Sequence, residues 1–289
     1  MKARIAMLGD WVRRRVTPAG AQWFDGALRE VAHDGGEPAL ARALGWAPRK
    51  LGKADLGLSD GEAAQAAALR PGLDAALWSV DQAARIAFIL AGLGGEPEAF
   101  AARLDSLADT AELNEAIALY RGFPLYPGAA AIEARARAAV RSAMRPLFEA
   151  IAHRNPYPAE QFDEAAWNQM VVKTFFLNSP LWPVQGIERR ANPALAAILL
   201  DLAHERWAAG RAVSAELWRC VGPYPGPAAC AAMERVLAGG SEPERLGVAL
   251  ALARAEGSDA ALLRAACARQ GLDQRAARAG WAALAAASG

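Results

Sequence analysis

Apolar residues recur every three or four positions along most of the chain, as in the segment EPERLGVALALAR at 242–254. No stretch alternates apolar and polar residues between two turns, the pattern that a half-buried strand would leave. The pattern therefore predicts helices joined by short loops. We expect them at 59–70, 79–90, 96–108, 110–121, 129–152, 160–177, 193–209, 214–221, 227–238, 242–255, 258–270 and 273–286, with two or three more in 1–58.

Capping residues and prolines mark the ends of these helices. Ser79 followed three residues later by Gln82 is a capping-box pattern. Asn192 followed by Pro193 combines a favoured N-cap with proline at the first helical position. Further starts, breaks or kinks are expected at Ser59, Thr110, Thr17-Pro18, Gly35-Gly36, Ala47-Pro48 and Pro146.

These helices are of a length to pack antiparallel, which predicts an all-α fold: an antiparallel helical array or irregular α-solenoid. The C-terminal helices resemble HEAT-like pairs, although no exact period repeats through the chain. We expect a helical extension at 1–58, a helical core at 59–224 and HEAT-like helices at 225–289 packed on that core, all in one continuous domain.

Composition supports this fold class and narrows the function. Alanine occupies 73 of the 289 positions, whereas valine, isoleucine and threonine together occupy 23. The formal net charge of +1 argues against a partner nucleic acid, because duplex binding requires a basic stripe. Three dispersed cysteines form neither a disulfide framework nor a zinc site, and no apolar run is long enough for a signal-peptide core or a transmembrane helix. We expect a soluble cytoplasmic protein.

One segment departs from the Ala- and Arg-rich background. The chain has 28 arginines but four lysines and five asparagines, and four of those asparagines lie within 155–192. Lys173 and the pair Phe175-Phe176 lie in the same region. Five large aromatic residues of the segment fill a core or line an apolar ligand pocket: Tyr157, Trp167, Trp182, Trp207 and Trp218. The segment 153–224 is therefore the first candidate for function.

A buried ion pair is expected within this segment. On a helical wheel, apolar side chains surround most of the helix 160–177, with Glu164 and Asn168 among them, so we expect a central, buried helix. Arg206 projects into the apolar face of the helix 193–209, and Glu164 is the partner that we expect for it. The pair could clamp two core helices, hold an anion beside the arginine, or use the carboxylate as a base.

Two further groups could bind ligands. Asp201-x-x-His204-Glu205 has helical spacing suited to metal ligands, but it lacks a second histidine-bearing helix, so we expect no metal site. Arg189 and Arg190 precede the helix N-terminus at Asn192, a combination suited to phosphate or carboxylate as well as to a solvated turn. No Walker loop or other catalytic motif is present, and we expect no cofactor.

The chain resembles the EboA domain family in five segments: WSVDQAARIAFIL, ALYRGFPLYP, HRNPYPAEQFDEAAWNQMVVKTFF, GIERRANPALA and LLDLAHERWAAGRAVSAELWRCVGP. The resemblance implies a gene in a compact bacterial cluster that includes a UbiA-like prenyltransferase and handles a secondary metabolite, with no reaction assigned to the EboA protein itself. It makes the matching polar positions candidate ligand-binding residues: His153, Asn155, Tyr157, Glu164, Trp167, Asn168, Lys173, Arg190, Asn192, Asp201, His204, Glu205 and Arg206.

Three functions follow from these observations. The leading hypothesis is a non-catalytic accessory protein that binds a small-molecule metabolite or an enzyme of the same gene cluster through 153–224. The alternative is an enzyme of that pathway, acting on an anionic cyclitol-like or prenylated molecule with Glu164, His153 or His204 as acid and base. The third is an interaction module whose HEAT-like helices present a concave face to a partner.

Overall fold

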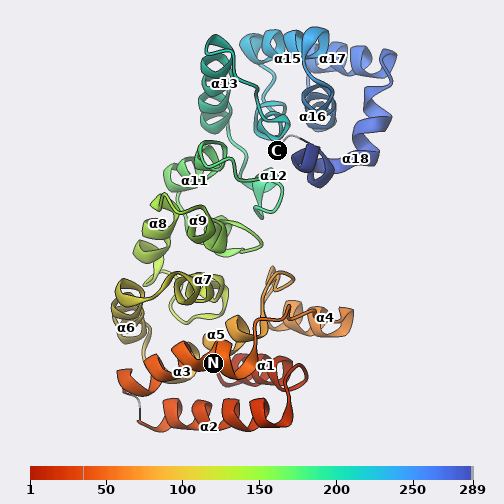
Figure 1. Ribbon diagram of the computed structural model, residues 1–289. Coiled ribbons are helices and arrows are strands. Elements are labelled where there is room, and N and C mark those ends of the chain that lie inside the picture. Colours follow the sequence, from red (N-terminus) through yellow and green to blue (C-terminus); the bar gives the residue numbers. More distant parts are fainter. Residues whose placement is uncertain (35, 288–289) are drawn as a thin grey trace. The chain divides into compact units, whose positions relative to one another are not determined.

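A computed structural model describes residues 1–34 and 36–287 and is all-α (Figure 1). The described residues form eighteen α-helices, two short 3-10 helices and no strand, and an isolated β-bridge joins Asp55 to Ser79. None of the described helices is long and apolar enough to cross a membrane. The chain divides into two compact units, Met1–Phe162 and Asp163–Gly289.

The first unit is built around a buried helix, α5. The apolar run of α5 includes Ile86 and Phe88, which are fully buried, and helices α1, α2, α3 and α7 pack against it. A second group forms where α9 packs against α7, α8 and α10. The helices of this unit are α1 (Lys2–Arg13), α2 (Pro18–Asp34), α3 (Glu37–Leu51), α4 (Asp60–Leu69), α5 (Val80–Gly92), α6 (Pro97–Thr110), α7 (Leu113–Arg121), η1 (Phe123–Leu125), α8 (Glu133–Arg141), α9 (Arg145–Ala152) and α10 (Tyr157–Gln161).

The second unit is centred on α16, which packs against α14, α15, α17, α18 and η2. The approach of α16 to η2 is so close that a Cβ on Gly247 would lie 2.4 Å from the carbonyl oxygen of Ala215. At the other end of the unit, α11 packs against α13. Its helices are α11 (Glu164–Phe176), α12 (Ile187–Arg190), α13 (Pro193–Ala208), η2 (Ala215–Leu217), α14 (Trp218–Val221), α15 (Pro227–Gly239), α16 (Glu242–Leu252), α17 (Ser258–Arg269) and α18 (Leu272–Ala287).

The predicted capping signals at Ser59, Ser79 and Asn192 are confirmed. The Ser59 hydroxyl accepts from the Glu62 N–H, and Glu62 in return accepts from the Ser59 N–H at 2.9 Å. Asn192 precedes α13 and accepts from the Leu195 N–H at 2.8 Å. These caps satisfy N–H groups that the first helical turn leaves without partners.

The predicted break at Ala47-Pro48 is wrong, because α3 continues through Pro48. A proline in a helix leaves the carbonyl of the residue four positions earlier without its usual donor. Here that carbonyl belongs to Leu44, and it accepts instead from Nε of the buried Arg85 at 3.0 Å. Arg85 therefore compensates for the missing bond, a tertiary contact that no local pattern encodes.

Two other boundaries differ from the prediction, and the interruption expected at Pro146 is confirmed. Thr110 ends α6, and Glu112 is the N-cap of α7. The run 129–152 is interrupted before Pro146, which lies in the first turn of α9, so the run forms two helices, α8 and α9. The predicted helix 160–177 is also two helices, because the Asp163 side chain caps α11 by accepting from the Ala166 N–H at 2.8 Å. The expected break at Gly35-Gly36 falls on Gly35, which lies outside the described residues, and the HEAT-like pairing remains a prediction.

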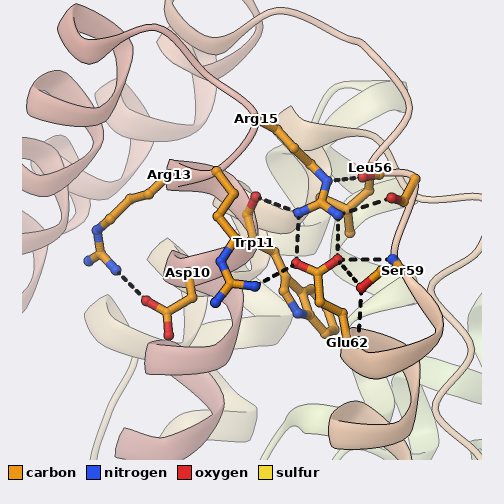
Figure 2. A network of polar contacts seen from close by, with 9 residues as sticks. Asp10, Trp11, Arg13, Arg15, Leu56, Ser59 and Glu62 are labelled. Atoms are coloured by element: carbon orange, nitrogen blue, oxygen red, sulfur yellow. Dashed lines mark hydrogen bonds and ion pairs between the residues drawn. The ribbon is translucent and has the colours of Figure 1, made fainter.

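A carboxylate in the first unit joins α1 to α4 (Figure 2). Glu62 is 6% exposed, and its two oxygens accept from the Arg15 guanidinium at 3.1 and 2.6 Å. The same guanidinium also donates to the carbonyls of Leu56, Gly57 and Trp11. Hydrogen bonds from Arg15 and Ser59 hold the pKa of Glu62 down, at about 2 instead of 4.5.

Candidate functional site

An open groove with a volume of about 780 Å³ lies between α11 and α13 in the second unit. Positions on α11 spaced three and four residues apart share one face of the helix, and they form one wall of this groove. Its lining, called the α11–α13 groove below, consists of Glu164, Ala165, Asn168, Gln169, Val172, Lys173, Phe176, Ala194 and Ile198. Three of the sequence candidates, Glu164, Asn168 and Lys173, are therefore brought together.

Apolar side chains dominate the surface of the groove and are open to solvent. Phe176 is 68% exposed and Ile198 is 44% exposed, although both belong to helices whose opposite faces are buried. Neighbouring apolar side chains in a groove, with a few polar groups beside them, are typical of ligand-binding sites. The expectation of a central, buried helix is therefore only partly met by α11, which is buried on one side and has one open face.

A pair of amides joins the two helices beside the groove. Asn168 on α11 is 6% exposed, and its Nδ2 donates to Oδ1 of Asn192 at 3.2 Å, while Nδ2 of Asn192 donates back to Oδ1 of Asn168 at 2.9 Å. Asn192 also caps α13 through the Leu195 N–H. The reciprocal pair fixes the start of α13 against the middle of α11, the two helices that form the groove.

Arg190 and Trp167 pack behind this amide pair. The Arg190 guanidinium lies over the fully buried Trp167 ring, 5.0 Å from its centroid, and the Arg190 carbonyl accepts from Nδ2 of Asn192 at 3.1 Å. Burial lowers the pKa of Arg190. Arg189, by contrast, is exposed. The two adjacent arginines therefore have different surroundings, and neither lines the groove.

The expected Glu164–Arg206 ion pair is wrong. Glu164 is exposed on the first turn of α11, and Nε of Arg206 donates to the Ala212 carbonyl at 2.6 Å. Glu164 is the first residue of α11 and lies on the face of that helix that lines the open groove, so its carboxylate is exposed to solvent. Arg206, in the last turn of α13, satisfies a carbonyl of the chain that leaves the helix.

The acidic and histidine positions of α13 lie apart from the groove lining. Asp201, His204 and Glu205 are all exposed, and the His204 ring lies 5.6 Å from Trp207. Trp207 in turn stacks on Trp218 at 6.0 Å. Among residues 1–34 and 36–287, no three His, Cys, Asp or Glu side chains are grouped so that they could hold a metal ion.

The remaining candidates belong to the first unit, where two of them stabilise a loop. Nδ2 of Asn155 donates to the Tyr120 carbonyl at 3.2 Å, and its Oδ1 accepts from the Tyr157 N–H at 3.0 Å. The Tyr157 hydroxyl donates to the Ala129 carbonyl, and burial raises the pKa of that hydroxyl. His153 lines a small cavity of about 70 Å³ with Arg121.

Sequence reasoning missed two kinds of residue. The first kind lines the groove: Gln169, Val172 and Ile198. These residues do so only because they lie on the open faces of α11 and α13. Glu216 is 3% exposed and accepts from the Leu181 N–H at 2.8 Å, which holds the loop after α11. Burial raises the pKa of Glu216. A glutamate within the apolar run SAELWRCV was the available signal.

Most of the chain matches a known protein family. Residues 4–222 match a family model described as metabolite traffic protein EboA. The match includes all of α11 and α13 and ends one residue after α14. No curated protein and no solved structure matches the chain.

Proposed function

Because the chain belongs to the EboA family of metabolite traffic proteins, we propose that it binds a small-molecule metabolite non-covalently in the α11–α13 groove. On this proposal it is an accessory protein of a bacterial secondary-metabolite pathway and carries out no chemistry of its own. The observation on which the proposal depends is the open groove itself, which joins exposed apolar side chains to polar candidate residues. A family role in metabolite traffic calls for a binding surface of this kind.

The lining indicates the chemistry of the metabolite. Phe176, Val172 and Ile198 offer an apolar surface, which favours an apolar or aromatic body. Lys173 adds a cation, and the exposed Gln169 adds an amide, so a polar or anionic group on the same molecule has partners. The lining runs from Glu164 to Phe176, and at a rise of about 1.5 Å per residue a ligand about 18 Å long could lie along it.

Two observations favour binding over acid–base catalysis. His153 and His204, which the enzyme hypothesis requires, do not line the groove. Glu164, its third candidate, is exposed, so water solvates its carboxylate. A partner enzyme of the same pathway is the other occupant that the sequence predicts for 153–224, and it would cover the same apolar face.

A fluorescent probe of matching chemistry tests the groove. Anilinonaphthalene sulfonate combines an aromatic body with a sulfonate, and its emission rises when it leaves water. We expect the folded chain to bind it, and Phe176→Ser to weaken binding by about 5- to 30-fold, the equivalent of 1 to 2 kcal/mol of lost apolar contact. Lys173→Gln should also weaken binding, because it removes the cation that would pair with the sulfonate.

The matched control is Leu262→Ser on α17, because Leu262 is 71% exposed and does not line the groove. Equal losses in Phe176→Ser and Leu262→Ser would contradict the groove as the binding site. Native mass spectrometry of the chain purified from cells that also express the neighbouring genes then identifies the natural occupant. A small mass excess that is lost on denaturation indicates a metabolite, whereas the mass of a second protein indicates a partner enzyme.

A further inference from the structure

The first unit carries an exposed tryptophan with two cations against its ring. Trp46, on α3, is 44% exposed. The Arg49 guanidinium lies 5.5 Å from the centre of its indole and the Lys50 ammonium lies 5.4 Å from it. Cation–π contacts hold both charges beside the indole at the surface. Neither the core of the unit nor the α11–α13 groove uses these three side chains.

Positive charge is concentrated at this end of α3. Arg49, Lys50 and Lys53 are all exposed, and none of the three forms an ion pair within the described residues. Two of the chain's four lysines stand here, three positions apart. Between Arg42 and Lys53 the chain has no acidic residue, and Asp55 is the next one. The surplus of cations is local, because the whole chain has a formal charge of only +1.

We propose that the surface formed by Trp46, Arg49, Lys50 and Lys53, called the α3 basic surface, docks the protein on an anionic phospholipid bilayer. Lysine and arginine are attracted to the negative headgroups, and the amphipathic indole of tryptophan is favoured at the depth of those headgroups. This inference concerns the first unit and does not depend on the proposed metabolite groove. It adds a membrane-surface contact to a chain whose described helices are too short or too polar to span a membrane.

The composition of the surface favours a bilayer over other anionic partners. A duplex nucleic acid is usually held by six or more phosphate contacts, and this surface offers three unpaired cations. A stable protein partner buries about 800 Å² on each side around an apolar centre, and here the one large apolar side chain is Trp46. A bilayer presents many headgroups at once, so each of the three cations and the interfacial indole can find a partner on the same surface.

Co-sedimentation of the full chain with vesicles tests the proposal. Vesicles of phosphatidylcholine alone are compared with vesicles that contain about one third phosphatidylglycerol, at low and high salt. Three cations near an anionic surface should increase binding by about 100-fold over the neutral vesicles. The preference should largely disappear near 0.5 M salt, where the charges are screened.

Charge reversal separates the local surface from the net charge. The triple variant Arg49→Glu, Lys50→Glu, Lys53→Glu should lose the preference for anionic vesicles. A control triple variant makes the same change in net charge at three exposed arginines of the second unit and should keep the preference for anionic vesicles. Its substitutions are Arg211→Glu, Arg269→Glu and Arg278→Glu. Trp46→Ala should bind several-fold more weakly than the wild-type chain. Circular dichroism and thermal melting establish that each variant is folded.

Three results would overturn the proposal. The first is equal binding of the wild-type chain to neutral and anionic vesicles. The second is an equal loss in the two triple variants, which would reduce the effect to net charge. The third is that the chain binds no vesicles but binds heparin or an acidic peptide in a salt-sensitive way, and that the α3 triple variant loses this binding. That result would assign the surface to an acidic macromolecule. Full binding by Trp46→Ala would overturn the role of the indole.

Discussion

Replacing Glu62 with glutamine should destabilise the first unit, by an amount that depends on pH. The Glu62 carboxylate accepts two hydrogen bonds from Arg15 and two from Ser59 (Figure 2), and Gln can accept only part of them. Its pKa is about 2 in the folded chain, against an ordinary value of 4.5. Each pH unit between those two values is worth 1.36 kcal/mol, which gives an upper limit of about 3 kcal/mol at neutral pH.

Solvent screening reduces this figure. The Arg14 side chain, which also contacts Glu62 at 3.2 Å, is 63% exposed, so its share of the attraction is weak. The Arg15 side chain is 18% exposed and supplies the better protected contact. We therefore expect Glu62→Gln to lower the free energy of unfolding by about 2 kcal/mol at pH 7.

The sign of the pH dependence follows from the lowered pKa. A carboxyl with a lower pKa in the folded state contributes its full stabilisation above the unfolded pKa of about 4.5 and loses it as the pH falls toward 2. The difference in unfolding free energy between wild type and Glu62→Gln should therefore shrink between pH 5 and pH 2. Other titrating groups cancel in that difference.

Urea denaturation followed by circular dichroism at pH 7 and at pH 2.5 measures this difference. Glu30→Gln is the control, because Glu30 pairs with Arg42 at the surface, where 46% of the Glu30 side chain and 56% of the Arg42 side chain are exposed. Exposed pairs contribute about 0 to 1 kcal/mol. A cost for Glu62→Gln no larger than that of Glu30→Gln, or one that is the same at both pH values, would refute the argument.

Two further substitutions test the packing of the second unit. Asn192→Ala should lower the free energy of unfolding by about 2 to 3 kcal/mol in thermal melts, because it removes the cap of α13 and leaves the buried Asn168 amide without its partner. A loss below about 0.5 kcal/mol would contradict the amide pair. Gly247→Ala should cost about 1 to 3 kcal/mol, because the added Cβ would lie 2.4 Å from the Ala215 carbonyl oxygen. Gly239→Ala is the control: no atom lies within 4 Å of a Cβ added there, so this variant should be neutral or slightly stabilising. Similar melting temperatures for the two alanine variants would argue against the close approach of α16 to η2.

Local signals in the sequence were sufficient for most helix starts. Ser59, Asp163 and Asn192 each cap a helix within three residues of themselves, so the interaction that defines the boundary lies inside the window that a pattern covers. The cap at Asp163 was not predicted, and for that reason α10 and α11 were expected as one helix over 160–177. The atypical composition of 153–224 also drew attention to Asn168 and Lys173, which the structure places in one groove.

The sequence by itself determined that the chain is helical, because alanine is abundant, β-branched residues are few, and spacings of three and four residues recur throughout. Tertiary structure alone decided which contacts form between residues far apart in the chain. Arg85 compensates for Pro48 across 37 positions, Asn168 meets Asn192 across 24, and Phe176 is left open to solvent although its helix is apolar on most sides. Periodicity indicates which face of a helix is apolar, but the face that water reaches depends on which other helices pack against it.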